Sequence, residues 1–365
     1  MDSILEEIQR FLKREIGEPK VVVMPDFFLD RLISLQCNRN QFSEMLENII
    51  GRKGGSIDGI EQTELRGGNA INTASALAAL GVKVTPIVCT DTFGMQIIKF
   101  YLEPLRTNLS HIKVSNELSV TTALEFEGEN SKVNVMLRDI GSLANFGPSS
   151  LGDDDFKAIE DADYVCVFNW AGTRRYGTVL AKTVFHYAKT RGKGKTYYDT
   201  ADPTPNKQKI PELVKNVLRR KDMDILSVNE NEAICYAKQL DHETEKLGKR
   251  LKIEELAKES ARILASHLSA RIDLHTTSFS ATFKNKGETL VSAFKIPVLR
   301  ATGAGDAWNA GNILGDAFGL SDDCRLALAN AVAAYYISNS EGTHPTRKGL
   351  IKFCEKLKRK QCIKS

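Results

Sequence analysis

The sequence predicts an α/β fold in which helices cover both faces of a mostly parallel central sheet. Short apolar runs of strand length alternate with longer segments of helical periodicity, and this alternation favours right-handed crossovers between parallel strands. Two pairs of strand-like runs flank turn residues and predict hairpins added to this layer. The chain has 365 residues, of which 42% are hydrophobic and 26% charged, as is typical of a globular protein with a sizeable core.

The first half of the chain combines regular elements with interruptions. A helix is predicted before the first strand because apolar residues recur at helical spacing, at Ile4, Ile8, Phe11 and Leu12. The predicted elements that follow are a buried strand over 21–24, an Ala- and Leu-rich helix over 72–80, a β-branched strand over 82–89 and a hairpin pairing 124–126 with 133–137. The segments at about 31–66 and 110–140 interrupt the alternation, and we expect them to form a small β lid.

The second half alternates more regularly. Apolar runs predict strands over 164–168, 195–198, 225–228 and 272–276, and a hairpin pairing 281–283 with 289–294. Helical patterns cover 179–189, a segment from about 230, 253–267, 304–318 and 325–338. We therefore expect an N-terminal helical extension over 1–20 and one α/β domain over 21–365 that carries both lid insertions.

Charge and hydropathy exclude several classes of partner. Lys and Arg number 50 against 46 Asp and Glu, a net charge of +4, and no basic stripe dominates, so a nucleic-acid partner is not expected. The basic tail over 352–364 is typical of a solvated helix end. Apolar runs fall far short of the roughly 20 residues that span a bilayer, and the first 20 residues do not have the pattern of a signal peptide. No membrane partner is expected.

The seven cysteines favour a reducing compartment. Their number is odd, no pair has CxxC spacing, and Cys166 lies within an apolar run. A disulfide framework is therefore not expected, and neither is a zinc site, because histidine and cysteine do not cluster at ligand spacing. We expect a cytoplasmic protein.

The segment from Arg300 to Trp308 is the strongest chemical motif. In the run Thr302-Gly303-Ala304-Gly305-Asp306, small residues precede a predicted helix, so the backbone can approach an anion and the helix start offers unpaired N–H groups. A carboxylate in that turn can take a proton from a hydroxyl that accepts phosphate. The alternative is an ordinary turn with a helix-capping aspartate.

Two other motifs precede predicted helices. The run Gly67-Gly68-Asn69 continues to Asn72, where glycines permit a sharp turn and asparagines can bind a polyol; the alternative is a plain capped helix. The run from Asn229 to Glu232 follows a predicted strand, and its carboxylate and amide suit hydrated Mg²⁺; the alternative is a polar helix start.

In this order, the three motifs resemble those of the ribokinase-like (PfkB) family of carbohydrate and nucleoside kinases. The resemblance extends from about Val21 to Leu350 and includes the predicted first strand with the acidic residues after it, as well as the turn from Asp91 to Gly94. It implies the ribokinase-like fold. It also implies a small-molecule kinase that transfers a phosphoryl group from a nucleotide to a hydroxyl of a sugar, and a homodimer formed through the lid.

The resemblance also implies roles for single residues. Asp306 would be the general base, and the backbone of Gly303, Ala304 and Gly305 would form the anion hole. The acceptor would be bound by Asp30, Gly68 and Asn69, with Asp26 and Asn72 as further candidates for the same pocket and turn capping as the alternative for Asp26. Arg138, at the end of a lid strand, is a candidate for an anionic acceptor, or a solvent-facing strand residue.

The donor side departs from the family pattern. Asn229 and Glu232 would orient Mg²⁺, and Asn229, Arg300, Thr302 and Thr277 are candidates for the nucleotide. Arg300 and Ala301 replace the Asp-Thr that the family usually has, and the stretch 274–281 has no glycine where the family has a Gly-rich turn. The His275-Thr276 pair is reminiscent of archaeal ADP-dependent relatives, so the expected donor is ATP or ADP; alone, His275 is more typical of a core histidine.

These departures leave three alternatives beside the sugar kinase: a nucleoside kinase, an ADP-dependent kinase for a sugar phosphate of the ribose-1-phosphate type, and a non-catalytic sugar- or nucleotide-binding regulator. A dinucleotide-dependent oxidoreductase is excluded because the first strand lacks the G-x-G-x-x-G loop.

Overall fold

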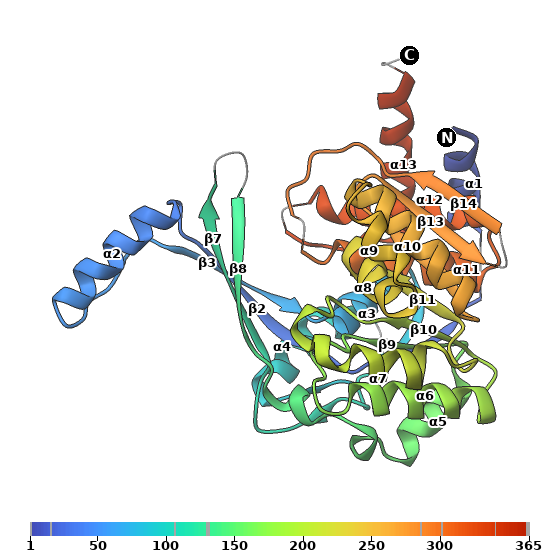
Figure 1. Ribbon diagram of the computed structural model, residues 1–365, viewed down its shortest axis with the longest axis horizontal. Helices are drawn as coiled ribbons and strands as arrows, with labels where there is room; N and C mark the ends of the chain where they lie inside the picture. Colours follow the sequence, from blue (N-terminus) through green and yellow to red (C-terminus); the bar gives the residue numbers. More distant parts are fainter. Residues whose placement is uncertain are drawn as a thin grey trace.

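The computed structural model describes residues 2–14, 17–105, 107–128, 132–284, 287–300, 302–339 and 341–362. An eight-stranded sheet has the order β14-β13-β12-β11-β10-β9-β1-β4 (Figure 1). The six strands from β12 to β4 run parallel, and β13 and β14 add an antiparallel hairpin at one edge. The strands are β1 Lys20–Met24, β4 Lys83–Pro86, β9 Tyr164–Phe168, β10 Lys195–Asp199, β11 Ile225–Val228, β12 Arg271–His275, β13 Phe279–Lys284 and β14 Gly287–Ser292.

Alternating side chains of the sheet build two hydrophobic cores, one on each face. Val21 and Val23 contribute to one core, whereas Val22 and Met24 contribute to the other. The helices on the first face are α1 Asp2–Lys13, α3 Asn69–Ala79, α4 Thr92–Leu102, α11 Ala304–Ala317, α12 Asp322–Ile337 and α13 Arg347–Cys362. Those on the second face are α5 Asp153–Asp161, α6 Gly177–Arg191, α7 Ile210–Leu213, α8 Glu230–Leu240 and α10 Ile253–His267. The predicted α/β class with helices on both faces is confirmed.

The N-terminal helix is part of this core. Leu5, Ile8 and Phe11 of α1 are buried against α12 and α13. Lys358 of α13 forms an ion pair with Glu6, so the first and last helices lie side by side (Figure 1).

A second, four-stranded sheet projects from the body. Its order is β3-β2-β7-β8, with β2 Phe28–Ser34, β3 Glu61–Gly67, β7 Val120–Glu127 and β8 Lys132–Asp139. Helix α2, Arg39–Gly51, joins β2 to β3 and extends away from the rest of the molecule (Figure 1). Asn38 caps it with a reciprocal hydrogen bond from Gln41, and none of its residues is buried.

Most elements lie where the sequence predicts them, and the differences have local causes. The predicted strand over 82–89 is interrupted after Pro86, and Cys89–Thr90 forms a separate short strand, β5, beside β6, Lys113–Val114. Within 31–66 the sequence predicts a β lid but does not give the bounds of individual strands. The reason is that β3 begins Glu-Gln-Thr-Glu and is mostly exposed, so it lacks an apolar pattern. None of the helices in the described part of the chain is long and apolar enough to cross a membrane.

Candidate functional site

Polar side chains gather at the carboxyl edge of the parallel strands, where open α/β sheets bind ligands. Asp26 follows β1 by two residues, and Asn169 and Asn229 directly follow β9 and β11. Asp199 and His275 are the last residues of β10 and β12. Helices α3 and α11 begin against this edge, so their first turns complete the site.

Asp306 lies at the centre of this arrangement, in the first turn of α11. Its side chain is only 5% exposed. The Nδ2 atoms of Asn69 and Asn72 donate to its two carboxylate oxygens at 2.8 and 3.0 Å. Burial raises the pKa of Asp306 well above its usual value, and the charges of Asp199 and Asp26 add to this rise. The structure therefore holds a carboxylate with high proton affinity at a helix start.

The turn before Asp306 requires glycine. Gly303 has φ +87°, and a Cβ there would lie 2.7 Å from the Tyr336 hydroxyl. The backbone N–H groups of Ala304 and Gly305 belong to the first helical turn, so they have no intrahelical acceptor and carry the positive end of the helix dipole. A Cβ at Gly305 would lie 3.4 Å from the His275 ring. An anion could approach this turn closely.

Asp26 holds the start of α3. It is fully buried, and its carboxylate accepts hydrogen bonds from the backbone N–H groups of Asn69 and Ala70 and from Asn169 Nδ2, at 2.7 to 2.9 Å. Burial raises the pKa of Asp26. The carboxylate thus caps α3 and fixes the Gly68-Asn69 turn. Turn capping is the role that the sequence offers for Asp26 as the alternative to acceptor binding.

Asp30 faces the body from the smaller sheet. Asp30 of β2, Thr121 of β7 and Arg138 of β8 form one row across three strands, so their side chains share a face. A Cβ at Gly67 would overlap the Asp30 carboxylate, so this glycine makes room for it. Burial raises the pKa of Asp30 to about 6, against the lowering effect of Arg300 and Arg138. Arg138 is exposed and lies 4.9 Å above the Phe28 ring.

Asn229 and Glu232 form a capping box at the start of α8. Asn229 donates its backbone N–H and its Nδ2 to the two oxygens of Glu232, at 3.0 and 2.8 Å, and its Oδ1 accepts from the Glu232 N–H. Burial raises the pKa of Glu232, and the charges of Asp199, Asp202 and Glu230 add to the rise. Several acidic groups therefore face one another here.

The predicted residues fall into two groups. Asp306 contacts Asn69 and Asn72, and Asp30 packs against Gly67, so the acceptor candidates of α3 and β2 come together with the turn of α11. On the other side, Thr277 is exposed and donates its N–H to Glu230 at 3.3 Å, next to the capping box of α8. Thr302 is also exposed.

Several residues at the site were not predicted from the sequence. Asn169 directly follows a predicted strand, as Asp199 does, and this position at a strand end could have identified it as a site residue. Arg66 directly precedes the Gly67-Gly68 turn and is only 8% exposed. Tyr336 and His344 stack with ring centroids 4.6 Å apart. No local pattern indicates these last two, because only the fold brings the 336–344 region beside Gly303 and Arg66.

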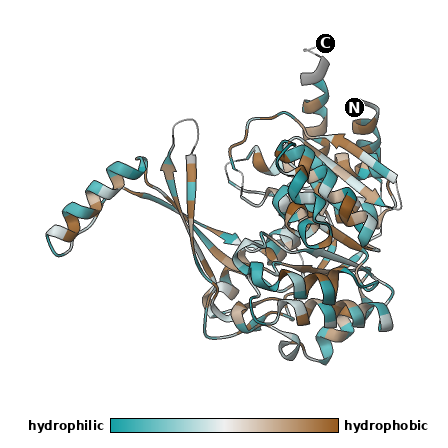
Figure 2. Ribbon diagram, in the orientation of Figure 1, coloured by the Kyte–Doolittle hydropathy of each residue, from teal (hydrophilic) through white to brown (hydrophobic). Residues whose placement is uncertain are grey.

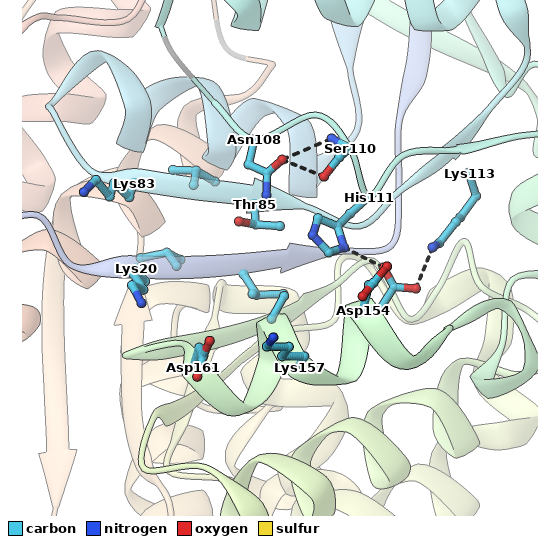
Figure 3. A pocket seen from close by; sticks show the side chains of 15 residues that line it. Lys20, Lys83, Thr85, Asn108, Ser110, His111, Lys113, Asp154, Lys157 and Asp161 are labelled. Atoms are coloured by element: carbon cyan, nitrogen blue, oxygen red, sulfur yellow. Dashed lines mark hydrogen bonds and ion pairs between the residues drawn. The ribbon is translucent and has the colours of Figure 1, made fainter.

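A cavity of about 590 Å³ lies at the opposite end of the strands (Figure 3). Lys20 and Lys83, the first residues of β1 and β4, line it, together with His111, Lys113 and Asp155. Asp155 is buried and accepts from His111 and Lys113 at 2.8 and 2.5 Å. Its charge is thus already compensated, and the cavity is remote from the carboxyl edge.

The fold is that of the ribokinase-like class of phosphotransferases. The chain belongs to the pfkB family of carbohydrate kinases, whose family model matches residues 36–348. The predicted family and the predicted enzyme class, a phosphotransferase with an alcohol group as acceptor, are confirmed. No curated protein sequence matches the chain significantly.

Solved structures share the fold at low identity. Ribokinase from Cryptococcus neoformans var. grubii serotype A in complex with ADP is 17% identical with a TM-score of 0.70, covering 93% of this chain and 99% of that one. Arabidopsis thaliana ribokinase with ribose and ATP is 19% identical with a TM-score of 0.67 and the same coverage of both chains. The nucleoside kinase of Methanocaldococcus jannaschii is 16% identical with a TM-score of 0.63, covering 93% of this chain and all of that one.

Proposed function

We propose that this protein transfers a phosphoryl group from ATP or ADP to a hydroxyl of a sugar, with Asp306 as the general base. The observation that carries the proposal is the position of Asp306. Its carboxylate is buried beside the first-turn N–H groups of α11 and is aligned by Asn69 and Asn72. A base and an anion hole thus lie within one helical turn, as in-line phosphoryl transfer requires.

In the proposed reaction, Asp306 takes the proton of the acceptor hydroxyl. The freed oxygen forms a bond to the terminal phosphorus of the nucleotide, while the bond from that phosphorus to the leaving oxygen breaks. The raised pKa of Asp306 brings its proton affinity closer to what a general base needs near neutral pH. The N–H groups of Gly303, Ala304 and Gly305 stabilise the charge on the transferred group.

The acceptor lies between α3 and the smaller sheet. Asp30 accepts hydrogen bonds from acceptor hydroxyls, while Gly68 and Asn69 supply close backbone and amide contacts. Asp26 and Asn72 act by positioning, since their side chains already hold the α3 turn and Asp306. The four strands form a lid whose Asp30 face covers the acceptor, so that water does not compete for the phosphoryl group.

The donor lies on the side of Asn229 and Thr277, with Thr302 beside the anion hole. Glu232, Asp199, Asp202 and Glu230 concentrate negative charge near the capping box, and this donor set fits Mg²⁺. In the described part of the chain, no three acidic, His or Cys side chains converge as direct metal ligands, so the ion would be held through its waters. When bound, Mg²⁺ supplies charge neutralisation of the donor phosphates.

The assembly is a homodimer formed through the lid, in a reducing, cytoplasmic compartment. On β8, Val133, Val135 and Leu137 alternate onto the face opposite Arg138, and each is about half exposed, at 53%, 45% and 55%. An apolar edge strand of this kind is uncommon in a monomer. The six cysteines whose side chains are described are all free.

A coupled phosphoryl-transfer assay tests the proposal. The purified protein is incubated with ATP or ADP, Mg²⁺ and a panel of sugars, sugar phosphates and nucleosides, and the product nucleotide is measured. We expect turnover with at least one acceptor and none when EDTA removes the metal. Acceptor binding without turnover across the panel would instead identify a binding regulator.

A further inference from the structure

Two arginines and a histidine gather beside the proposed acceptor site, and no acidic side chain among the described residues pairs with them. Arg66 is the last residue but one of β3, and its guanidinium lies 4.8 Å over the Tyr101 ring. Its Nη2 donates to the Gly342 carbonyl at a long 3.4 Å. The Arg300 guanidinium packs against the Cα of Gly342, so that a Cβ there would overlap it. The two cations are therefore close neighbours, with Gly342 common to both.

An aromatic wall completes this cluster. The Arg300 guanidinium lies 5.7 Å from the centre of the Tyr336 ring, on which His344 stacks. Tyr336 is the residue whose hydroxyl would collide with a Cβ at Gly303. The cationic cluster, formed by Arg66 and Arg300 with the His344 ring beside them, thus adjoins the turn that starts α11.

Polar atoms of the cluster are left unsatisfied. Within the described ranges, Arg66 Nε, Arg300 Nε and both ring nitrogens of His344 are buried without a hydrogen-bond partner, and neither arginine has a carboxylate at ion-pair distance. A buried guanidinium without a counter-charge costs free energy, and buried donors are rarely left unpaired without a reason. Burial and the neighbouring Arg300 charge lower the pKa of Arg66, as expected where positive charge is not neutralised.

The cluster lies on the acceptor side of the site. Arg66 directly precedes Gly67, against which the Asp30 carboxylate packs. The charge of Arg300 acts on Asp30, and that of Arg66 acts on Asp306. The donor candidates Asn229 and Thr277 belong to the opposite group. Arg300, which the sequence offers as a further candidate for the nucleotide, instead lies beside Tyr336 and Gly342, and its charge acts on Asp30.

We propose that Arg66 and Arg300 bind an anionic group, a phosphate or a carboxylate, carried by the acceptor whose hydroxyl reaches Asp306. The inference rests on the proposed function and names the class of its acceptor. Guanidinium groups bind such oxyanions through paired, charge-assisted hydrogen bonds, which would satisfy the free Nε donors. His344 closes the subsite as a neutral ring, because burial and both arginines lower its pKa.

Calorimetric binding in the absence of nucleotide tests this subsite. The probes are ribose 1-phosphate, ribose 5-phosphate, fructose 6-phosphate and gluconate, each measured against its neutral parent sugar. We expect at least one anionic member to bind the wild-type protein about 10-fold or more tightly than its parent. Replacing Arg66 by Gln should weaken that member by about 10- to 100-fold and leave the parent sugar almost unchanged. A comparison of the affinity for gluconate with that for the sugar phosphates shows whether the subsite prefers a carboxylate or a phosphate.

Matched variants control for folding and for site assignment. Arg300→Gln changes the less buried arginine, and Arg66→Lys keeps the charge and should restore part of the affinity. Arg31→Gln, at a half-buried position of β2, removes an arginine that pairs with Glu64 outside the cluster, and it should have no effect. Equal binding of all anionic and neutral partners to the wild-type protein would overturn the inference. So would Gln variants that weaken ATP or ADP binding rather than acceptor binding.

The two proposals can fail separately. Turnover of neutral sugars with no preference for their anionic counterparts would contradict the subsite and leave the kinase. Arginine-dependent binding of an anionic sugar without phosphoryl transfer to any acceptor would contradict the kinase and leave the subsite.

Discussion

At the scale of single residues, the site depends on carboxylates that burial makes easier to protonate. Asp30 and Asp306 both have raised pKa values, and both lie beside asparagine, glycine or arginine residues that fix their position. Their proposed roles differ, since Asp30 accepts hydrogen bonds from the acceptor while Asp306 accepts a proton. The pH dependence of binding and of stability therefore reports on them.

Acceptor binding should weaken as the pH falls below about 6, the pKa of Asp30. Above that value the ionised carboxylate accepts hydrogen bonds, and below it protonation removes up to about 10-fold in affinity for each pH unit. The measurement is the acceptor KM between pH 5 and 8 in the wild-type protein and in Asp30→Asn. The variant should have a high KM throughout, and a wild-type KM that is flat across this range would contradict the role of Asp30.

The same shift has a defined sign for stability. The folded-state pKa of Asp30, about 6, lies above the ordinary value of 3.8, so its contribution to stability is present below pH 3.8 and is lost as the pH rises through 6. Asp30→Asn lacks this titration. Its melting temperature relative to wild type should therefore be higher at pH 7.5 than at pH 4.5, as scanning calorimetry at both values can test. A difference that does not change with pH would refute the raised pKa.

Loss of the Asp26 carboxylate should lower the stability of the folded protein. Asp26→Asn places an amide NH₂ where three donors converge, so at least one buried donor loses its partner. We expect the free energy of unfolding to fall by about 1–3 kcal/mol in urea denaturation. Asp153→Asn, on the exposed first turn of α5, is the matched control and should change it little. Equal stability of the two variants would argue against the capping role.

At the scale of elements, the start of α11 depends on its backbone conformation. Gly303→Ala introduces a Cβ at φ +87° and into the Tyr336 hydroxyl, so the turn proposed as the anion hole must shift. We expect kcat to fall by about 10²-fold, since displacing a catalytic group by about 1 Å has an effect of that size. Gly319→Ala, beyond the other end of α11, also has positive φ, +64°, but no atom lies within 4 Å of its Cβ. It should lose stability and keep kcat; an equal loss of kcat in both variants would contradict the account.

The sequence predicts elements where their cause is local. The strands over 164–168 and 225–228 are continuous apolar runs, and the structure has them at those bounds. The strand β3 is mostly exposed and polar, so its pattern did not indicate it. The cationic cluster cannot be predicted from any local pattern, because Arg66 contacts Gly342, which lies 276 positions away in the sequence. The order of the three motifs in the sequence indicates Asp306 and its neighbours as site residues. Only the three-dimensional structure shows that Arg66 and Arg300 lie beside them.

At the scale of the whole molecule, the two faces of the proposed lid would have different roles. One face carries Asp30 and Arg138 toward the site, and the other carries the apolar residues of β8. Figure 2 shows hydrophobic colour along β8, interrupted by hydrophilic residues. Since a lid that pairs with a second copy would cover this apolar face, oligomerisation and acceptor enclosure are linked in the proposed protein.

Charge on the apolar face should disrupt the dimer. The double variant Val135→Lys, Leu137→Lys should elute as a monomer in size-exclusion chromatography with light scattering, whereas the wild-type protein should have twice the chain mass. Asn134→Lys adds a lysine on the other face of β8 and should leave the dimer intact. A wild-type protein that is monomeric at micromolar concentration would refute the proposed assembly.

The most direct test of the proposed chemistry is the kcat of Asp306→Asn with an acceptor that the wild-type protein phosphorylates. The variant places an amide of nearly the same shape where the carboxylate was, and this amide cannot take the proton. We predict that kcat falls by about 10²- to 10⁴-fold, while nucleotide affinity and the far-UV circular dichroism spectrum stay unchanged. A variant that folds and retains kcat within a factor of a few would show that Asp306 is not the base.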